Sequence, residues 1–408
     1  MNSNNTGWQW PLAGLMILLL TGCLADDSDE GTPLPGGETG EDIAFNVETL
    51  IEGLVHPWSL AFLENESGDQ ALVTERPGRL RLIDLETGTM QEITGLPDIA
   101  AIGQGGLLDV ILHPDYGSGR EWVYLSYVAE DDGNGRYATH VGRGRLDIDN
   151  LALLDFEVLH VATPFSGGGQ HFGSRLAFDS QWRLYVTVGD RGDRHSAQDL
   201  ESHWGKTLRL DDDGSIPADN PFVGDADALD AIYTYGHRNA QGMTVHPQTG
   251  VIWLNEHGQM NGDEINIIDQ PGGNYGWPIA THSREYGSGE PIGDLPEERE
   301  DTVNPVYYWD GTRYDDGQAG FPPSGMAFHF GDAFSAWNGE LFMGNLAHQY
   351  LARFEVQGRE VIREHRLLRG QGWRIRDVRI HPGSGHIVVL VDAENGRVAR
   401  LIPEDATD

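Results

Sequence analysis

The sequence predicts an all-β fold, a six-bladed β-propeller of four-stranded antiparallel blades. The chain of 408 residues contains 54 Gly and few long apolar stripes with helical spacing, which is typical of short strands joined by many turns. A short apolar segment recurs six times, and a turn and a second β-rich run follow each copy. Six units of one four-stranded blade each make a propeller. The apolar segments span residues 60–62, 110–112, 176–178, 243–245, 326–328 and 378–380.

Residues 1–23 have the pattern of a lipoprotein-type signal peptide. The apolar run 12–20 is too short to span a membrane as a helix, and small residues and Cys23 follow it. This ending resembles the lipobox of bacterial lipoproteins, in which Cys23 is lipidated and becomes the mature N-terminus. An ordinary secretory signal with a chance Cys is the alternative, since residues 1–11 contain no Lys or Arg. We expect an exported protein on the periplasmic side, lipid-anchored to the outer membrane because Leu24 and not Asp follows the Cys.

Residues 24–42 are acidic, contain Gly and Pro and have no apolar pattern, so we expect a disordered acidic tether. The propeller is expected to occupy residues 43–404. A net charge of −37 argues against binding nucleic acid or an anionic membrane surface through bulk electrostatics. Lys206 is the only lysine, so Arg carries nearly all positive charge. With a single Cys the chain forms no internal disulfide.

The repeat separates the histidines into two groups. His113, His246 and His381 each stand before a Pro in the equivalent turn of three blades, which predicts a structural role. His171 and His257 lie elsewhere in their blades, which makes them candidates for a functional role.

Polar residues recur at the ends of the expected inner strands. Antiparallel strands bring the entry of one strand and the exit of the next to the same edge, and in a propeller this edge faces one mouth of the central channel. Several arginines at one mouth predict a compact anionic ligand, because guanidinium groups pair with carboxylate or phosphate. The entries carry Gln104, His171, Arg238, Arg374 and Arg376, and the exits carry Glu75, Asp190, Glu256, Asn345 and Asp392.

His171 and Asp190 are a candidate acid–base pair. His171 lies on a Gly-rich turn before one expected strand, and Asp190 follows the next strand. A carboxylate at that edge can orient an imidazole base. The alternative is a turn His capped by a turn Asp.

The loop of residues 256–264 is a candidate calcium loop. A hard cation takes carbonyl and carboxylate oxygens from loops of this kind. No His-x-x-x-His or Cys pair indicates zinc, and no Gly-rich phosphate loop indicates a nucleotide. A plain acidic hairpin is the alternative. The long segment 281–323 is expected to form a rim over the mouth.

Six motifs resemble the glucose/sorbosone dehydrogenase family, and within it the soluble aldose sugar dehydrogenases that use pyrroloquinoline quinone (PQQ). The resemblance extends over residues 47–403, with the motifs in order, and implies a six-bladed propeller with PQQ over the mouth and calcium bound to the quinone. The motifs are HFGSRL from His171, GHRNAQG from Gly236, NEHG from Asn255, GDEIN from Gly262, GNYGWP from Gly273 and RIRDV from Arg374.

The resemblance implies oxidation of aldose sugars at C1 to the lactone. His171 would be the general base for the anomeric hydroxyl, with hydride transfer to PQQ and electrons passed on to an external acceptor. Asp190 would orient His171, and Arg238 would polarise the quinone oxygen. The residues implied to bind PQQ or to tether its arginines are Gln104, Arg238, Asn239, Asn345, Leu346, Arg374, Ile375, Arg376 and Asp392.

The resemblance also implies two calcium sites. Carbonyls of Gly258 and Gln259 would ligate the catalytic ion, and Glu264 and Tyr275 match a second, structural site. Gln259 stands where the family usually has Pro, so the loop is expected to lose rigidity. Ala347 stands where some members have a cofactor-binding Lys, which predicts weaker PQQ binding than in a Lys-bearing relative.

Two other classes remain open at this point. A calcium-dependent propeller lactonase or related hydrolase would need side-chain carboxylates and Asn around one metal, whereas Arg and Gln dominate the expected mouth. A non-catalytic sugar-binding propeller would have no use for the pair His171 and Asp190. In each case we expect a monomer or a homodimer with a small-molecule ligand.

Overall fold

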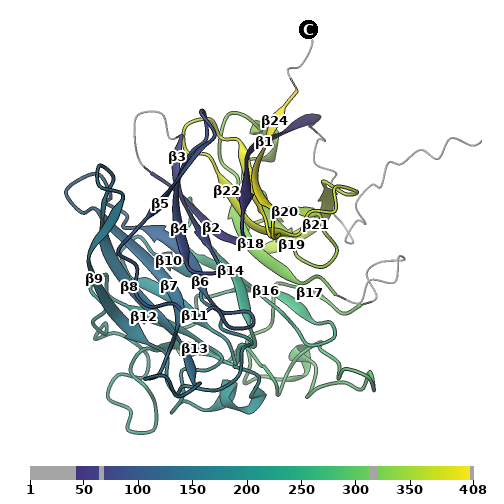
Figure 1. Ribbon diagram of the computed structural model, residues 1–408. Coiled ribbons are helices and arrows are strands. Elements are labelled where there is room, and N and C mark those ends of the chain that lie inside the picture. Colours follow the sequence, from purple (N-terminus) through teal and green to yellow (C-terminus); the bar gives the residue numbers. More distant parts are fainter. Residues whose placement is uncertain (1–42, 64–68, 312–319, 405–408) are drawn as a thin grey trace, which may run out of the picture. The chain divides into compact units, whose positions relative to one another are not determined.

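The computed structural model describes residues 43–63, 69–311 and 320–404. This part of the chain forms six four-stranded antiparallel sheets, which are the blades of a six-bladed β-propeller (Figure 1). The predicted fold class is therefore confirmed. The expected signal peptide with Cys23 and the expected tether 24–42 lie outside the described residues. Among the described residues, no helix has the length and apolar character needed to cross a membrane.

The first three blades follow one another in chain order. Blade one contains β2 (Pro57–Phe62), β3 (Gln70–Glu75), β4 (Arg79–Asp84) and β5 (Thr89–Ile93). Blade two contains β6 (Leu107–Leu112), β7 (Trp122–Glu130), β8 (Tyr137–Asp147) and β9 (Ala152–Val161). Blade three contains β10 (Leu176–Phe178), β11 (Leu184–Val188), β12 (Lys206–Leu210) and β13 (Ile232–Tyr235).

The last three blades repeat this order until the final strand. Blade four contains β14 (Ala240–Val245), β15 (Ile252–Glu256), β16 (Asp263–Ile267) and β17 (Tyr307–Trp309). Blade five contains β18 (Pro323–Phe328), β19 (Leu341–Asn345), β20 (Leu351–Gln357) and β21 (Glu360–Leu367). Blade six contains β22 (Ile375–Ile380), β23 (Ile387–Val391), β24 (Gly396–Pro403) and β1 (Phe45–Leu54). Three short 3₁₀ helices complete the described part: η1 (Arg194–Gln198), η2 (Pro296–Glu298) and η3 (Ser335–Trp337).

The innermost strands surround the central channel. Strands β2, β6, β10, β14, β18 and β22 contact one another in a closed ring, with β22 returning to β2. All six apolar segments of the sequence repeat lie in these strands, because each inner strand is covered by neighbouring blades on both faces. The repeat in the sequence therefore marks the inner strand of every blade.

The first strand of the domain pairs with the last one and so closes the ring of blades. β1 pairs antiparallel with β24 in a register that runs from Phe45 opposite Pro403 to Leu54 opposite Gly396. Figure 1 shows the purple first strand beside the yellow last strands. Pairing the first strand with the last blade covers the edge of β24 and joins the two ends of the propeller domain in one sheet.

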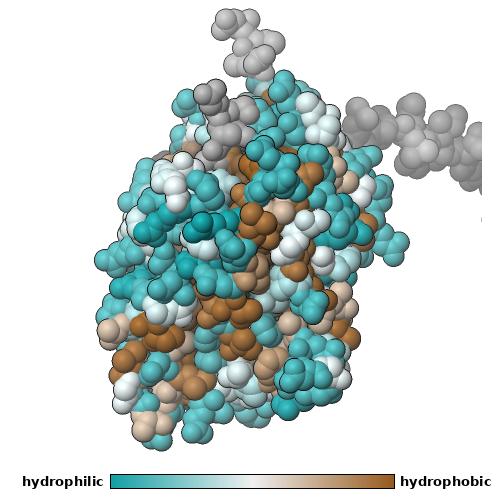
Figure 2. All heavy atoms as spheres, turned by 60° about the vertical axis from the view of Figure 1, so that its left-hand side comes forward, coloured by the Kyte–Doolittle hydropathy of each residue, from teal (hydrophilic) through white to brown (hydrophobic). Residues whose placement is uncertain are grey.

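Each pair of neighbouring blades shares a hydrophobic cluster. Val73 and Leu60 of blade one, for example, pack with Leu390 of blade six, and Leu72 packs with Val110 of blade two. The second strands of the blades, such as β3, are almost entirely buried, whereas β9 at the outer edge has only one fully buried position. Figure 2 turns the side of β9 forward and shows apolar patches within a mostly hydrophilic surface, in agreement with exposed Leu154 and Val158.

The His-Pro turns have the structural role that the repeat predicts. In each turn the histidine Nδ1 accepts a hydrogen bond from the backbone N–H two residues later. The N···N distances are 2.9 Å for His113, 3.2 Å for His246 and 3.1 Å for His381. These three rings stabilise turns at the ends of inner strands.

A fully buried arginine fills the channel between the inner strands. The NH1 atom of Arg175, directly before β10, lies 3.0 Å from Asp377 Oδ1 and 3.4 Å from Asp109 Oδ1. Its Nε donates to the Gln241 carbonyl at 2.7 Å and its NH2 to the Arg376 carbonyl at 3.1 Å. One guanidinium thus joins residues from blades two, three, four and six.

We expect Arg175→Met to lower the free energy of unfolding by up to about 3–5 kcal/mol, because the buried carboxylates of Asp109 and Asp377 lose their buried cation and keep only the partly exposed Arg379, whose NH2 lies 3.5 Å and 3.1 Å from them. The measurement is the shift of the denaturant midpoint. Arg400→Met is the matched control, since the exposed pair of Arg400 with Glu48 at 2.8 Å contributes at most about 1 kcal/mol. Equal shifts for both variants would contradict this role of Arg175.

Candidate active site

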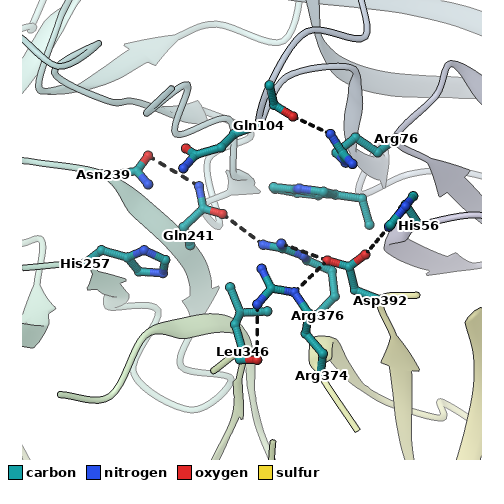
Figure 3. Close-up of a pocket in the computed structure, with 12 residues that line it drawn as sticks. His56, Arg76, Gln104, Asn239, Gln241, His257, Leu346, Arg374, Arg376 and Asp392 are labelled. Carbon is teal, nitrogen blue, oxygen red and sulfur yellow. Dashed lines mark hydrogen bonds and ion pairs between the residues drawn. The ribbon is translucent and has the colours of Figure 1, made fainter. Parts of the chain in front are cut away.

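A cavity of about 290 Å³ opens at the edge of the propeller where the inner strands begin. Gln104, Asn239, Leu346, Arg374, Arg376 and Asp392, all predicted to lie near a ligand, are brought together here. The full lining is His56, Trp58, Arg76, Gly103, Gln104, Asn239, Gln241, His257, Leu346, Arg374, Arg376 and Asp392 (Figure 3).

Asp392 holds the positive groups of this cavity in place. Arg374 Nε and Arg376 NH2 each donate to its Oδ2 at 3.1 Å, and His56 Nδ1 lies 2.8 Å from its Oδ1. Burial opposes ionisation of this carboxyl, but the charge of Arg376 and the bond from His56 outweigh burial and hold the pKa of Asp392 well below its usual range. The carboxylate is therefore charged at neutral pH.

Arg376 continues a line of hydrogen bonds across the cavity (Figure 3). Its NH1 donates to Gln241 Oε1 at 3.0 Å, and Gln241 Nε2 donates to Asn239 Oδ1 at 3.4 Å. Burial lowers the pKa of Arg376 to about 10, so the guanidinium stays charged at neutral pH. Within the described part of the chain its buried Nε has no hydrogen-bond partner.

His171 and Asp190 form the predicted pair. His171 Nδ1 lies 2.6 Å from Asp190 Oδ1. The other carboxylate oxygen accepts a bond from the indole N–H of Trp277 at 2.9 Å. Burial raises the pKa of Asp190, but the hydrogen bond and charge of His171 and the charge of Arg238 outweigh burial, so this pKa lies below its ordinary value. The ionised carboxylate of Asp190 accepts a hydrogen bond from the Nδ1–H group of His171, which leaves Nε2 with the free lone pair.

Backbone geometry places His171 beside the large cavity, although the residue is not part of its lining. Its φ of 52° is left-handed, and its N–H donates to Gln104 Oε1 at 2.8 Å. Gly189 allows this approach, because a Cβ at that position would lie 2.2 Å from the His171 carbonyl oxygen. His171 is thereby tied to a residue that does line the cavity.

Arg238 contacts both the pair of His171 with Asp190 and the candidate calcium loop 256–264. Its carbonyl accepts from the Asp190 N–H at 2.8 Å, and its own N–H donates to Glu256 Oε2 at 2.7 Å. Its guanidinium lies 5.3 Å from the centre of the Trp277 ring and donates to the His257 carbonyl at 3.3 Å. The buried Nε of Arg238 has no partner among the described residues.

A second, much smaller cavity of about 10 Å³ brings together most of the metal candidates. Gly258, Glu264 and Tyr275 line it together with Glu256, whereas Gln259 is outside this lining. Burial and the charge of Glu256 raise the pKa of Glu264 well above its ordinary value. Two buried carboxyl groups at one point provide oxygen ligands for a hard cation.

Three of the residues expected at the mouth do not line the cavity. The Asn345 side chain accepts from the His348 N–H at 2.7 Å, and Ile375 is packed in the core between blades five and six. Glu75 is fully buried and pairs with Arg79 at 2.7 Å and Arg81 at 2.6 Å. The position of a residue at the entry or exit of a strand tells at which end of the blade it lies, but it does not tell which way its side chain points.

Six lining or supporting residues were not predicted to act: His56, Trp58, Arg76, Gly103, Gln241 and Trp277. A signal existed for three of them. His56 directly precedes β2 and Arg76 directly follows β3, so the rule that found Gln104 applies to them as well. Gln241 lies two residues after Asn239 and therefore on the same side of its strand.

His257, which the repeat analysis singled out, lines the large cavity as a neutral ring. Burial lowers the pKa of His257 to about 3, opposed by its bond to Pro323. Its Nε2 donates to the Pro323 carbonyl at 2.6 Å. This geometry gives His257 a fixed orientation and no charge at neutral pH.

The comparisons with known proteins agree over the whole folded part. The family model described as glucose/sorbosone dehydrogenase matches residues 54–400. Aldose sugar dehydrogenase YliI of Escherichia coli (strain K12) is 41% identical over 365 residues, which cover 88% of this chain and 93% of that protein. The structure of the soluble aldose sugar dehydrogenase from Escherichia coli in the apo-form has a TM-score of 0.82 at 41% identity, covering 88% of this chain and 100% of the other. The PQQ-bound form of aldose sugar dehydrogenase from Streptomyces coelicolor has a TM-score of 0.70 at 28% identity, covering 89% and 99%.

Fold and site together define a six-bladed propeller with an arginine-lined cavity next to a His–Asp pair. The family match spans most of the chain, and so do the relatives above. The chain belongs to the glucose/sorbosone dehydrogenase family, a family of oxidoreductases, as its motifs predict.

We expect Asp392→Asn to lower stability by about 1.5–3 kcal/mol at neutral pH, because two arginines lose their charged acceptor. The pKa of Asp392 is depressed on folding, so its contribution is present above the unfolded value near 4 and is lost as the pH falls. The difference in Tm between wild type and variant should therefore shrink between about pH 5 and about pH 3. A constant difference over this range would contradict the assignment.

Proposed function

We propose that this protein oxidises aldose sugars at C1 to the lactone, with PQQ and calcium as cofactors. The observation that carries the proposal is the basic Nε2 of His171, oriented by Asp190, beside a cavity lined by several arginines. The PQQ-bound relative from Streptomyces coelicolor supports the choice of cofactor. The reduced cofactor would pass its electrons to an external acceptor.

The large cavity fits a planar polyanion. Arg374 and Arg376 line it, and Arg238 lines the smaller cavity next to it, which shares His257 with the large one. Guanidinium groups bind carboxylates through charge-assisted hydrogen bonds, and PQQ carries carboxylates. When bound, PQQ supplies a quinone that accepts hydride.

His171 would act as the general base in this reaction. With Nδ1–H donated to Asp190, Nε2 can take the proton of the anomeric hydroxyl. The ionised Asp190 stabilises the resulting imidazolium, and Trp277 keeps the carboxylate aligned through its second oxygen. Arg238 and Asn239, at the start of β14, would face the oxygen on which negative charge grows.

The donor set around residues 256–264 fits calcium. Carbonyl oxygens of Gly258 and Gln259 would hold the ion beside the cofactor, and Glu264 and Tyr275 would hold a second ion. Gly258 is needed here, because a Cβ would lie 2.0 Å from the Asn261 carbonyl oxygen. A cation would also offset the charge of the buried carboxylate of Glu264.

The sequence pattern of residues 1–23 further supports an exported protein, lipid-anchored through Cys23. The large cavity favours an organic polyanion over the metal site of a lactonase, since Arg, His and amide groups dominate its lining. A dehydrogenase is therefore the proposal that accounts for the whole site.

We expect His171→Ala and Asp190→Asn to reduce kcat for dye-coupled aldose oxidation by about 10²–10⁴-fold, because each removes general-base catalysis. PQQ affinity should change little, since neither residue lines the cavity. Turnover is measured with PQQ, calcium and an artificial acceptor, and affinity by PQQ absorbance.

His246→Ala is the matched control, because His246 belongs to a structural turn. Its turnover should equal that of wild type. Wild-type protein without PQQ-dependent turnover on any aldose would overturn the proposed function. Full activity in His171→Ala would overturn the assignment of the base alone.

We expect Ala347→Lys to tighten PQQ binding by about tenfold or more, because the exposed Ala347 follows Leu346 of the cavity and a lysine there gains a charge-assisted hydrogen bond. Ala347→Met adds similar length without charge and should leave the affinity unchanged. Equal affinities for both variants would show that the missing Lys does not limit PQQ binding.

A further inference from the structure

Gln259 of the candidate calcium loop makes hydrogen bonds through its backbone N–H and its side chain, and a proline at this position could make neither kind. The Gln259 N–H donates to Ser283 Oγ at 3.1 Å, a bond that needs the hydrogen absent from proline. The hydroxyl of Tyr286 donates to the Gln259 carbonyl. Both partners belong to the rim segment that follows the loop in the chain.

The side chain of Gln259 belongs to a closed triangle, which we call the Arg194–Gln259–Glu285 network. Arg194 NH2 donates to Gln259 Oε1 at 3.0 Å, and Gln259 Nε2 donates to Glu285 Oε2 at 2.5 Å. Arg194 NH1 closes the triangle with Glu285 Oε1 at 2.6 Å. The pKa of Glu285 is lowered by the hydrogen bond from Arg194, so its carboxylate is charged at neutral pH.

The network connects three separate parts of the mouth. Arg194 begins η1, four residues after Asp190, and its guanidinium lies 5.6 Å from the centre of the Trp277 ring. Trp277 itself donates to Asp190. Glu285 lies in the rim, and Gln259 in the calcium loop. The loop is thus tied to the segment that carries the partner of the candidate base.

We propose that the Arg194–Gln259–Glu285 network holds the calcium loop in place of the proline usual in the family, and that it makes calcium retention dependent on charge and salt. The inference rests on the proposed function, in which the carbonyls of residues 258 and 259 ligate calcium. A proline fixes φ covalently, whereas this network holds the loop through an ion pair. Arg194 and Glu285 have side chains 31% and 38% exposed, so dissolved salt screens their attraction.

Three expectations follow for the holoenzyme with PQQ and calcium. Glu285→Gln should release calcium about two- to fivefold faster than wild type, the size of effect that one exposed ion pair gives. Gln259→Pro should release calcium independently of Glu285, so that adding Glu285→Gln to it changes the rate little. High salt should accelerate release from wild type more than from Gln259→Pro.

The experiment is a chase of the holoenzyme with excess EGTA at about 0.01 M and about 1 M ionic strength, between which the Debye length falls from about 30 Å to about 3 Å. A calcium indicator follows release, and PQQ absorbance identifies the ion next to the cofactor. Glu290→Gln is the matched control, since it removes the same charge from an exposed position of the same rim. Thermal unfolding of each variant excludes a general loss of structure.

The outcomes separate the two proposals. A wild-type protein that binds PQQ but no calcium would overturn the calcium part of the proposed function, and this inference with it. Calcium binding with equal release rates in Glu285→Gln and Glu290→Gln would overturn the network alone. The same would follow if Glu285→Gln accelerated release as strongly in the Gln259→Pro background.

Discussion

The buried guanidinium of Arg175 is the interaction on which the site depends. Its charge is taken out of water, so it must be met by Asp109 and Asp377 and by two backbone carbonyls. Those carbonyls belong to Gln241 and Arg376, whose side chains line the cavity. The backbone of Gln241 and Arg376 therefore accepts hydrogen bonds from Arg175 in the channel and also positions two side chains of the cavity. A change in the packing around Arg175 would displace both side chains.

The local charge of the cavity is opposite to the charge of the protein. The chain carries a net charge of −37, yet Arg374, Arg376 and Arg238 meet at one end of the channel. Such a cluster is stable only if carboxylates offset part of its repulsion, and Asp392 does so for two of these arginines. The guanidinium groups of Arg374 and Arg376 in the lining of the large cavity favour an anionic ligand over a cationic one. A neutral sugar is not repelled by the acidic surface around it.

The repeat predicted the blades because each inner strand is buried on both faces and so keeps its apolar residues. The same repeat predicted Gln104, Arg374, Arg376 and Asp392, since strand ends are fixed by the strands themselves. The pairing of β1 with β24 and the hydrogen bond from Trp277 to Asp190 could not be predicted from the repeat. Each joins segments that are far apart in the chain, and the repeat does not say which distant segments meet. Asn345 shows a further limit, since position at a strand end does not determine the direction of a side chain.

Gln259 and Glu285 lie in loops, where a substitution disturbs fewer contacts than it does in the strands of a blade. Strands place His171, Asp190 and the arginines, so a change there disturbs several blades at once. Loops are constrained only by their own contacts, and a proline in one of them can be exchanged for a side chain that reaches a neighbour. Gln259 makes this exchange with Arg194 and Glu285, and through Trp277 the contact extends to Asp190. A loop held by an exposed ion pair responds to salt in a way that a proline does not, because dissolved ions screen the attraction between Arg194 and Glu285.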